Sequence, residues 1–200
     1  MAHLAIVGSH SVNGVAALHT KLLKSSLIPD FYALWPERFN NKTNGVTQRR
    51  WLLKCNPQLA ELICDTIGDG WITDLDQLRG LEQYADDRAF QQQFREIKRA
   101  NKAKLARVIA DTAQVQVSPD SLFDIQAKRI HEYKRQLLNI MNVIHEYLML
   151  IEEGKKPLVP RTYIFAGKAA PGYWAAKQII KLINNVGEVV NCDPRVEDLI

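Results

Sequence analysis

The sequence predicts an α/β fold in which a doubly wound parallel sheet is flanked by helices. Residues 121–127 and 161–167 have the alternating or continuous apolar patterns of buried strands. A helical pattern joins them from about residue 130 to residue 153, and another covers residues 172–186. Strands joined by helical crossovers of this length run parallel and have helices on both faces of their sheet. Residues 188–191 are expected to form a further strand.

The beginning of the chain also has the pattern of strand, turn and helix. Residues 4–8 are a short apolar run ending in glycine and are predicted to form a buried strand. A polar turn follows, and residues 15–25 have helical periodicity, with Asn13 as the expected N-cap. Residues 29–44, which contain two prolines and three asparagines, are expected to be an irregular connector in which a domain boundary could fall.

Three helices are predicted over the middle of the chain. The first has Pro57 at its first position and ends before Gly68, and the third begins at an aspartate cap, either Asp86 or Asp87. Their expected ranges are residues 58–66, 73–84 and 87–113.

Composition excludes several protein classes. The chain has 200 residues, enough for one large domain or parts of two, and 46% of them are hydrophobic, which excludes collagen-like and disordered chains. The net charge of +4 does not by itself define an anionic partner. Three cysteines without a C-x-x-C spacing fit a reducing, cytoplasmic location, and no apolar run is long enough to cross a membrane.

The predicted long helix carries six basic residues and one acidic residue between positions 95 and 107. Such a run could bind nucleic acid, or it could be a solvated outer face. Because no aromatic or glycine-rich partner accompanies it, the solvated face is favoured and no nucleic-acid partner is expected.

Four cations and an imidazole gather where residues 121–127 end and the next helix begins, a position where open α/β sheets bind ligands. A phosphate would neutralise cations that otherwise repel one another at the positive end of a helix. The alternative is a solvated helix start, salt-bridged to Glu132 and other acids. We expect the basic side chains to precede the first helical turn or to share one of its faces: Lys128, Arg129, His131, Lys134 and Arg135.

Two weaker motifs accompany this cluster. Residues 167–173 form a strand-to-helix turn with two glycines, which is either a ligand contact or merely a structural turn, and it matches no established phosphate-loop pattern. Residues 41–45, followed by Arg49, Arg50 and Trp51, combine amides, cations and an indole and fit either a sugar site or a capped turn. The histidines show no metal-ligand spacing, so no metal site is expected.

These segments resemble the glycogen and starch (α-1,4-glucan) phosphorylase family. The resemblance extends over essentially the whole chain, and its most specific segment is residues 128–136, Lys-Arg-Ile-His-Glu-Tyr-Lys-Arg-Gln. Further matching segments are residues 1–16, 39–51, 74–78, 167–173 and 189–191, although Gln48 stands where the family often has proline.

The resemblance implies a glycosyltransferase with two Rossmann-like domains facing across a cleft, the GT-B arrangement. Orthophosphate cleaves the terminal α-1,4 bond of a glucan and releases glucose 1-phosphate with retention. The implied cofactor is pyridoxal 5′-phosphate, whose phosphate relays protons to the substrate phosphate. The implied assembly of the full-length enzyme is a homodimer.

The resemblance also implies roles for residues around the phosphates. Arg129 and Lys134 are expected to bind the substrate phosphate, and Lys128 is expected to lie beside the cofactor phosphate. Trp51 is expected beside the cofactor ring.

Further residues are implied to bind the sugar or an inhibitor. Asn44 is expected to hydrogen-bond the glucosyl unit, with Val15 and Tyr133 lining its pocket. Tyr173 and His131 match an inhibitory site for planar ligands at the mouth of the cleft.

Members of this family are several times longer than this sequence. We therefore expect residues 1–40 to end an N-terminal glucan-binding domain and residues 41–200 to begin the cofactor domain. The family's Schiff-base lysine lies in a Glu-Ala-Ser-Gly-Thr-Gly-Asn-Met-Lys motif that is absent from this sequence. We therefore expect the isolated chain to be inactive. The alternatives are another GT-B enzyme that uses a sugar nucleotide, and a basic nucleic-acid-binding module.

Overall fold

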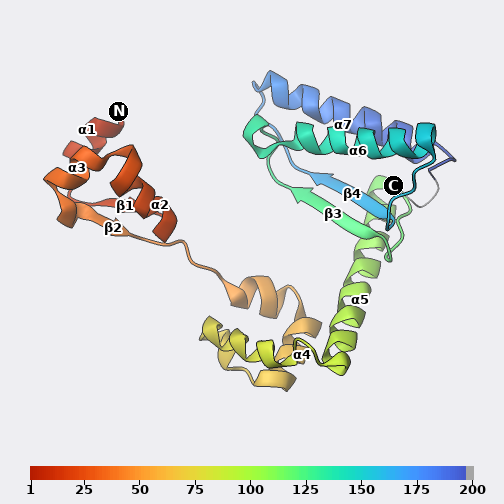
Figure 1. Cartoon of the computed structure of the whole chain (residues 1–200), viewed down its shortest axis with the longest axis horizontal. Helices are drawn as coiled ribbons and strands as arrows, with labels where there is room; N and C mark the ends of the chain where they lie inside the picture. Colours follow the sequence, from red (N-terminus) through yellow and green to blue (C-terminus); the bar gives the residue numbers. More distant parts are fainter. Residues whose placement is uncertain (197–200) are drawn as a thin grey trace. The chain divides into compact units, whose positions relative to one another are not determined.

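The computed structural model describes residues 1–196, which fall into two compact units divided after Leu81. Both units are mixtures of helices and short strands (Figure 1). Each of the two small sheets is a pair of parallel strands. The predicted α/β class with parallel pairing is confirmed at this level.

The first unit begins with short helices around one strand pair. Strands β1 (Val12–Gly14) and β2 (Phe39–Asn41) pair in parallel, with Val12 opposite Phe39. The surrounding elements are α1 (Ala2–Val7), α2 (Ala17–Leu22), the π-helical turn Leu23–Leu27, α3 (Pro29–Leu34) and the 3-10 turn Pro36–Arg38.

The remainder of this unit is built around α4 (Pro57–Ile67). Pro57 occupies the start of this helix, and Gly68 ends it with φ +84°, a conformation that favours glycine. Its buried face packs on the fully buried Trp71. The neighbouring helical segments are the π-helix Arg49–Lys54, the 3-10 turn Gly70–Ile72 and the 3-10 helix Leu75–Tyr84, which reaches the second unit.

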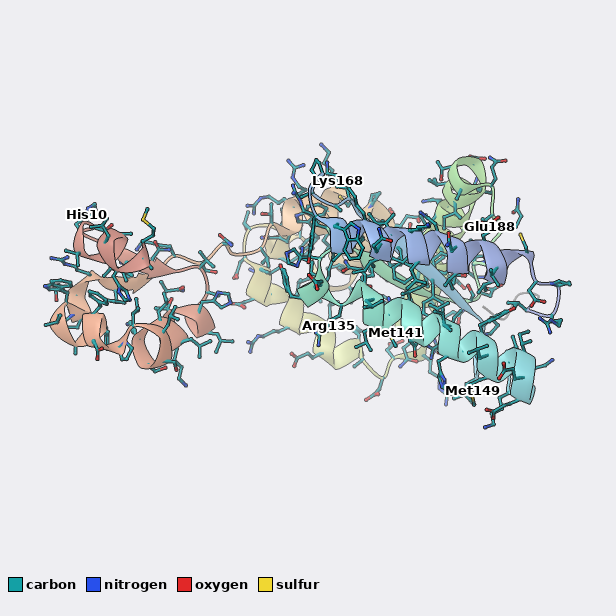
Figure 2. The ribbon with its side chains drawn as sticks, turned by 90° about the horizontal axis from the view of Figure 1, so that it is seen from above. His10, Arg135, Met141, Met149, Lys168 and Glu188 are labelled. Atoms are coloured by element: carbon teal, nitrogen blue, oxygen red, sulfur yellow. The ribbon has the colours of Figure 1, made fainter. Side chains whose placement is uncertain are left out.

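The second unit contains the longer elements. Helix α5 (Arg88–Ala113) precedes β3 (Leu122–Ala127), α6 (Gln136–Glu153), β4 (Arg161–Ala166) and α7 (Trp174–Cys192). Strands β3 and β4 pair in parallel over their whole length, from Leu122 opposite Arg161 to Ala127 opposite Ala166. Helices α6 and α7 lie side by side along this sheet (Figures 1 and 2).

Two predicted strands are helical. Residues 4–7 lie in α1, and Gly8 directly after it donates from its backbone N to Leu4 O, the fourth residue back, at 3.0 Å. Such a short apolar run can satisfy either conformation. Residues 188–191 continue α7, because this helical turn buries Val190 against Leu150 of α6.

The predicted helix starts also need correction. Asn13 lies in β1, and Ala16 is the residue that precedes α2. Residues 29–44 are not wholly irregular, because they contain α3 and β2. The helix expected from residue 130 begins at Gln136, because Arg135 before it has φ +65°, in the left-handed region.

Candidate anion-binding site

Two loops follow the carboxyl ends of the neighbouring strands β3 and β4. We call residues 128–135 the cationic loop and residues 167–173 the glycine loop. Hydrogen bonds connect their beginnings, from Lys128 N to Ala166 O at 2.9 Å and from Ile130 N to Lys168 O at 3.2 Å. Figure 2 places Lys168 and Arg135 at the end of this unit where α7 and α6 begin.

The close approach of the loops depends on Gly167. A Cβ atom on this residue would lie 2.0 Å from the carbonyl oxygen of Lys128 and 3.2 Å from Cδ1 of Ile130. Ile130 itself is buried against Ala176 and Ile179 of α7. The cationic loop is therefore anchored by backbone pairing on one side and by an apolar side chain on the other.

The cationic loop is not the helical turn that the spacing predicted. It contains one 3-10 turn, Glu132–Lys134, and its other residues lie outside helices. His131, Lys134 and Arg135 therefore do not share one face of an α-helix. The left-handed conformation of Arg135 separates this turn from α6.

Four cations of the two loops are exposed and Lys134 is half-buried, and none of them has an acidic partner among the described residues. Among residues 1–196, the side chains of Lys128, Arg129, Lys134, Arg135 and Lys168 form none of the ion pairs within 4.0 Å. Glu132, the nearest acid in sequence, instead accepts a hydrogen bond from the hydroxyl of Tyr173. The proposed salt-bridged helix start is thus not what the structure contains, and the positive charge is available to an anion.

Aromatic rings surround His131. Its ring centre lies 4.8 Å from that of Tyr133 and 4.9 Å from that of Tyr173, in edge-on contacts. The ammonium of Lys134 lies 5.7 Å from the centre of the Tyr133 ring. The hydrogen bond to Glu132 raises the pKa of the Tyr173 hydroxyl, because it stabilises the protonated phenol.

The residues expected to bind sugar or the cofactor ring lie mainly in the first unit. Asn44 N donates to Val15 O at 3.3 Å, so the structure brings this predicted pair together. The side chain of Val15 is 46% exposed and that of Trp51 is 72% exposed. Tyr133, 71% exposed, lies in the other unit with Lys128, Arg129, His131, Lys134 and Tyr173.

Sequence reasoning missed the amides that support the cationic loop. Gln136 is fully buried, and Gln126 and Asn139 form a hydrogen-bonded pair beside the loop. The one signal in the sequence is the position of Gln136 at the end of the cationic motif. Its burial depends on contacts that the sequence does not specify.

Two other kinds of feature are absent from residues 1–196. Within residues 1–196, no group of three or more His, Cys, Asp and Glu side chains is arranged to hold a metal ion. None of the helices in the same range is both long and apolar enough to cross a membrane.

Parallel strands that end in a cationic loop and a glycine loop define an α/β protein with a candidate site at the strand ends, where such sheets bind ligands. The family model described as carbohydrate phosphorylase matches residues 1–200, and the chain belongs to this family. The resemblance found in the motifs is therefore confirmed.

The chain is similar in sequence to several proteins that are named glycogen phosphorylase. Glycogen phosphorylase of Synechocystis sp. is 57% identical over 198 residues, covering 99% of this chain and 23% of the relative. Glycogen phosphorylase 2 of Dictyostelium discoideum is 57% identical over 201 residues, covering 100% of this chain and 20% of the relative. The muscle form of glycogen phosphorylase from Oryctolagus cuniculus is 55% identical over 198 residues, covering 99% of this chain and 24% of the relative. The chain thus spans less than a quarter of the length of these relatives.

Proposed function

We propose that the chain forms part of an α-1,4-glucan phosphorylase, which uses orthophosphate to release glucose 1-phosphate, with retention, from a terminal α-1,4 bond. The observation that carries this proposal is the cationic loop, whose basic side chains have no acidic partner among the described residues. The glycogen phosphorylase names of its relatives support the choice of glucan as substrate.

Arg129 and Lys134 bind the substrate phosphate in this proposal. A guanidinium makes paired contacts with phosphate oxygens, whereas an ammonium provides a point charge. Because the backbone of their loop is fixed by β4 and by Ile130, these charges need little reorganisation as negative charge develops on the phosphate.

Asn44, Val15 and Tyr133 are proposed to bind the terminal glucosyl unit. Asn44 and Val15 are joined through their backbones, which leaves the side-chain amide of Asn44 as a hydrogen-bonding group for a sugar hydroxyl. Tyr133 supplies an exposed ring of the kind that packs on sugars.

The exposed Lys128 at the start of the cationic loop fits the phosphate group of pyridoxal 5′-phosphate. Trp51 offers an exposed indole to its ring. The chemistry supplied by the bound cofactor is proton exchange between its phosphate and the substrate phosphate. Lys128 would hold that group by charge, and the neighbouring Arg129 would hold the substrate phosphate against it.

His131 and Tyr173 are proposed to bind a planar inhibitor. Their rings are already in edge-on contact, and the hydroxyl of Tyr173 is held by Glu132. An aromatic ligand could extend this cluster.

We also propose a domain architecture for the full-length enzyme. It comprises two Rossmann-like domains in the GT-B arrangement, with residues 1–40 ending the first domain and residues 41–200 beginning the cofactor domain. A cytoplasmic homodimer is proposed for the full-length enzyme.

A chimera tests the proposed reaction. Residues 1–200 would replace the matching segment of the Oryctolagus cuniculus relative, with which they share 55% identity. We expect the chimera to release glucose 1-phosphate from glycogen only when orthophosphate is present. A folded chimera that releases none, while the parent enzyme is active in the same assay, would contradict the proposal.

A further inference from the structure

Gln136 is a polar side chain with no exposed surface, and both ends of its amide are used. Its Nε2 donates to the carbonyl oxygen of Arg129 at 3.1 Å. Its Oε1 accepts from the backbone N of His131 at 3.3 Å. One buried side chain therefore holds the cationic loop at two backbone positions, one of them belonging to Arg129.

A second amide holds the other end of the same loop. Gln126, on β3, donates from Nε2 to the carbonyl oxygen of Lys134 at 2.9 Å. Its Oε1 accepts from Nδ2 of Asn139 at 3.0 Å, which fixes the orientation of the amide. The backbone of Lys134 is thus tied to the sheet.

The conformation of the loop makes these contacts necessary. Outside its single 3-10 turn the loop belongs to no helix or strand, and Arg135 adopts the left-handed conformation that residues other than glycine rarely adopt. A backbone of this kind keeps one geometry only where its surroundings determine it. The carbonyls held by the two glutamines belong to Arg129 and Lys134, the pair proposed to bind the substrate phosphate.

We infer that Gln136 and Gln126 are positioning residues, which set the spacing of Arg129 and Lys134 for an oxyanion without touching it. This inference rests on the proposed function of those two cations. It assigns to the two amides a contribution to phosphate affinity beyond their contribution to folding.

The test uses the 200-residue chain labelled with ¹⁵N and three variants of it. Gln136→Met and Gln126→Met keep the approximate volume of the side chain and remove its hydrogen bonds. Gln178→Met makes the same change at an exposed position of α7 and is the matched control. For each protein, amide hydrogen exchange in the cationic loop is measured, and inorganic phosphate is titrated against chloride at constant ionic strength.

We expect Gln136→Met and Gln126→Met to accelerate exchange of the loop amides and to weaken phosphate binding by about tenfold, by analogy with the lower end of the loss seen when a hydrogen-bond partner that orients a metal ligand is removed. Gln178→Met should change neither quantity. If Gln136→Met fails to fold, Gln126→Met decides, because it removes the hydrogen bonds to Lys134 and Asn139 and leaves the buried Gln136 in place.

Folded variants that bind phosphate as well as the unmodified chain would overturn the inference, whatever their exchange rates. If the unmodified chain itself shows no phosphate response, the proposed function fails at this site. The positioning role is then decided by exchange alone, and unchanged exchange in the cationic loop overturns it.

Discussion

Gly167 allows the cationic loop and the glycine loop to lie close together, because glycine has no Cβ atom. The space that a Cβ would need is occupied by the Lys128 carbonyl, at 2.0 Å. Real Cβ atoms do not approach backbone oxygen so closely, so either loop would have to move. Because Lys128 begins the cationic loop, the effect of such a movement would extend to the proposed phosphate site.

We predict that Gly167→Ala lowers the free energy of unfolding by about 1–3 kcal/mol, the usual effect of overpacking. Urea denaturation followed by circular dichroism measures this change. Gly187→Ala is the matched control, because its Cβ would meet no atom within 4 Å and it lies inside α7. This control should instead stabilise the chain, by roughly 1 kcal/mol, since alanine is the better helix former. Equal effects of the two variants would refute the steric explanation.

At the scale of elements, the start of α5 depends on one side chain. Oδ1 of Asp87 accepts hydrogen bonds from the backbone N of Ala89 at 2.7 Å and of Phe90 at 3.0 Å. These bonds satisfy two donors that have no partner within the helix. Of the two aspartates that the sequence offered as the cap, the structure uses Asp87.

Asp87→Ala is therefore expected to cost about 1 kcal/mol of stability, within the range of about 0.5–2 kcal/mol for lost N-caps. The loss should appear as a lower urea midpoint. Asp86→Ala, the adjacent control, should leave the midpoint almost unchanged. A larger effect from Asp86→Ala would show that the cap has been assigned to the wrong residue.

Helices α6 and α7 are connected through Asp193, at the end of α7. Its Oδ2 accepts from the hydroxyl of Tyr147 at 2.7 Å, and Arg195 donates to both carboxylate oxygens. The hydrogen bonds from Arg195, and then that from Tyr147, hold the pKa of this carboxyl well below its ordinary value of 3.8. The contact therefore stabilises the folded chain while the carboxyl is ionised.

The pH dependence follows from the sign of this shift. A lowered pKa in the folded state gives stability that is present above the unfolded pKa and is lost as the pH falls toward the folded pKa. Asp193→Asn should lower the melting temperature at pH 7, and its difference from the unmodified chain should shrink below about pH 3.8. Asp111→Asn, at an exposed position of α5, is the control. A difference that stays constant with pH would rule out this explanation.

Long elements with clear end signals could be predicted from the sequence. Helix α5 has apolar periodicity and an aspartate cap, and α4 lies between Pro57 and Gly68. The short segments 4–8 and 188–191 could not be predicted, because segments of four or five residues fit either a strand or a helix. Packing decided the second case, through the contact of Val190 with α6.

The location of the candidate site could also be predicted, but its conformation could not. A cluster of cations directly after a strand indicated an anion site at the edge of the sheet. The left-handed Arg135 and the buried Gln136 belong to the folded loop, in which the Gln136 amide bonds the backbones of Arg129 and His131. Local spacing contains no signal for such contacts.

At the scale of the whole molecule, basic charge is divided between two regions with different expected roles. The cationic loop has no acidic partners among the described residues, whereas the basic run of α5 is partly used within the protein. Arg99 makes two hydrogen bonds with Asp120, at 2.8 and 3.1 Å. Lys102 bonds the carbonyl of Ser121 and lies 4.7 Å from the ring centre of Phe123.

We accordingly predict that the chain does not bind random duplex DNA, even at low salt. Gel-shift and fluorescence anisotropy titrations at 50 mM and 200 mM salt would measure this. A shift that is strong at low salt and disappears at high salt would contradict the prediction, because it would indicate release of counterions from phosphates contacted by the helix.

Arg129 is the residue on which the proposed phosphate site depends most, and its role can be measured in the chimera with the Oryctolagus cuniculus relative. The measurement is kcat/KM for orthophosphate in glycogen phosphorolysis, with Arg129→Ala compared against Arg95→Ala, an exposed arginine of α5. We predict a loss of about hundredfold or more for Arg129→Ala, as expected when a preorganised charge is removed from the reacting phosphate, and little change for Arg95→Ala. Equal kcat/KM values for the two variants would contradict the account.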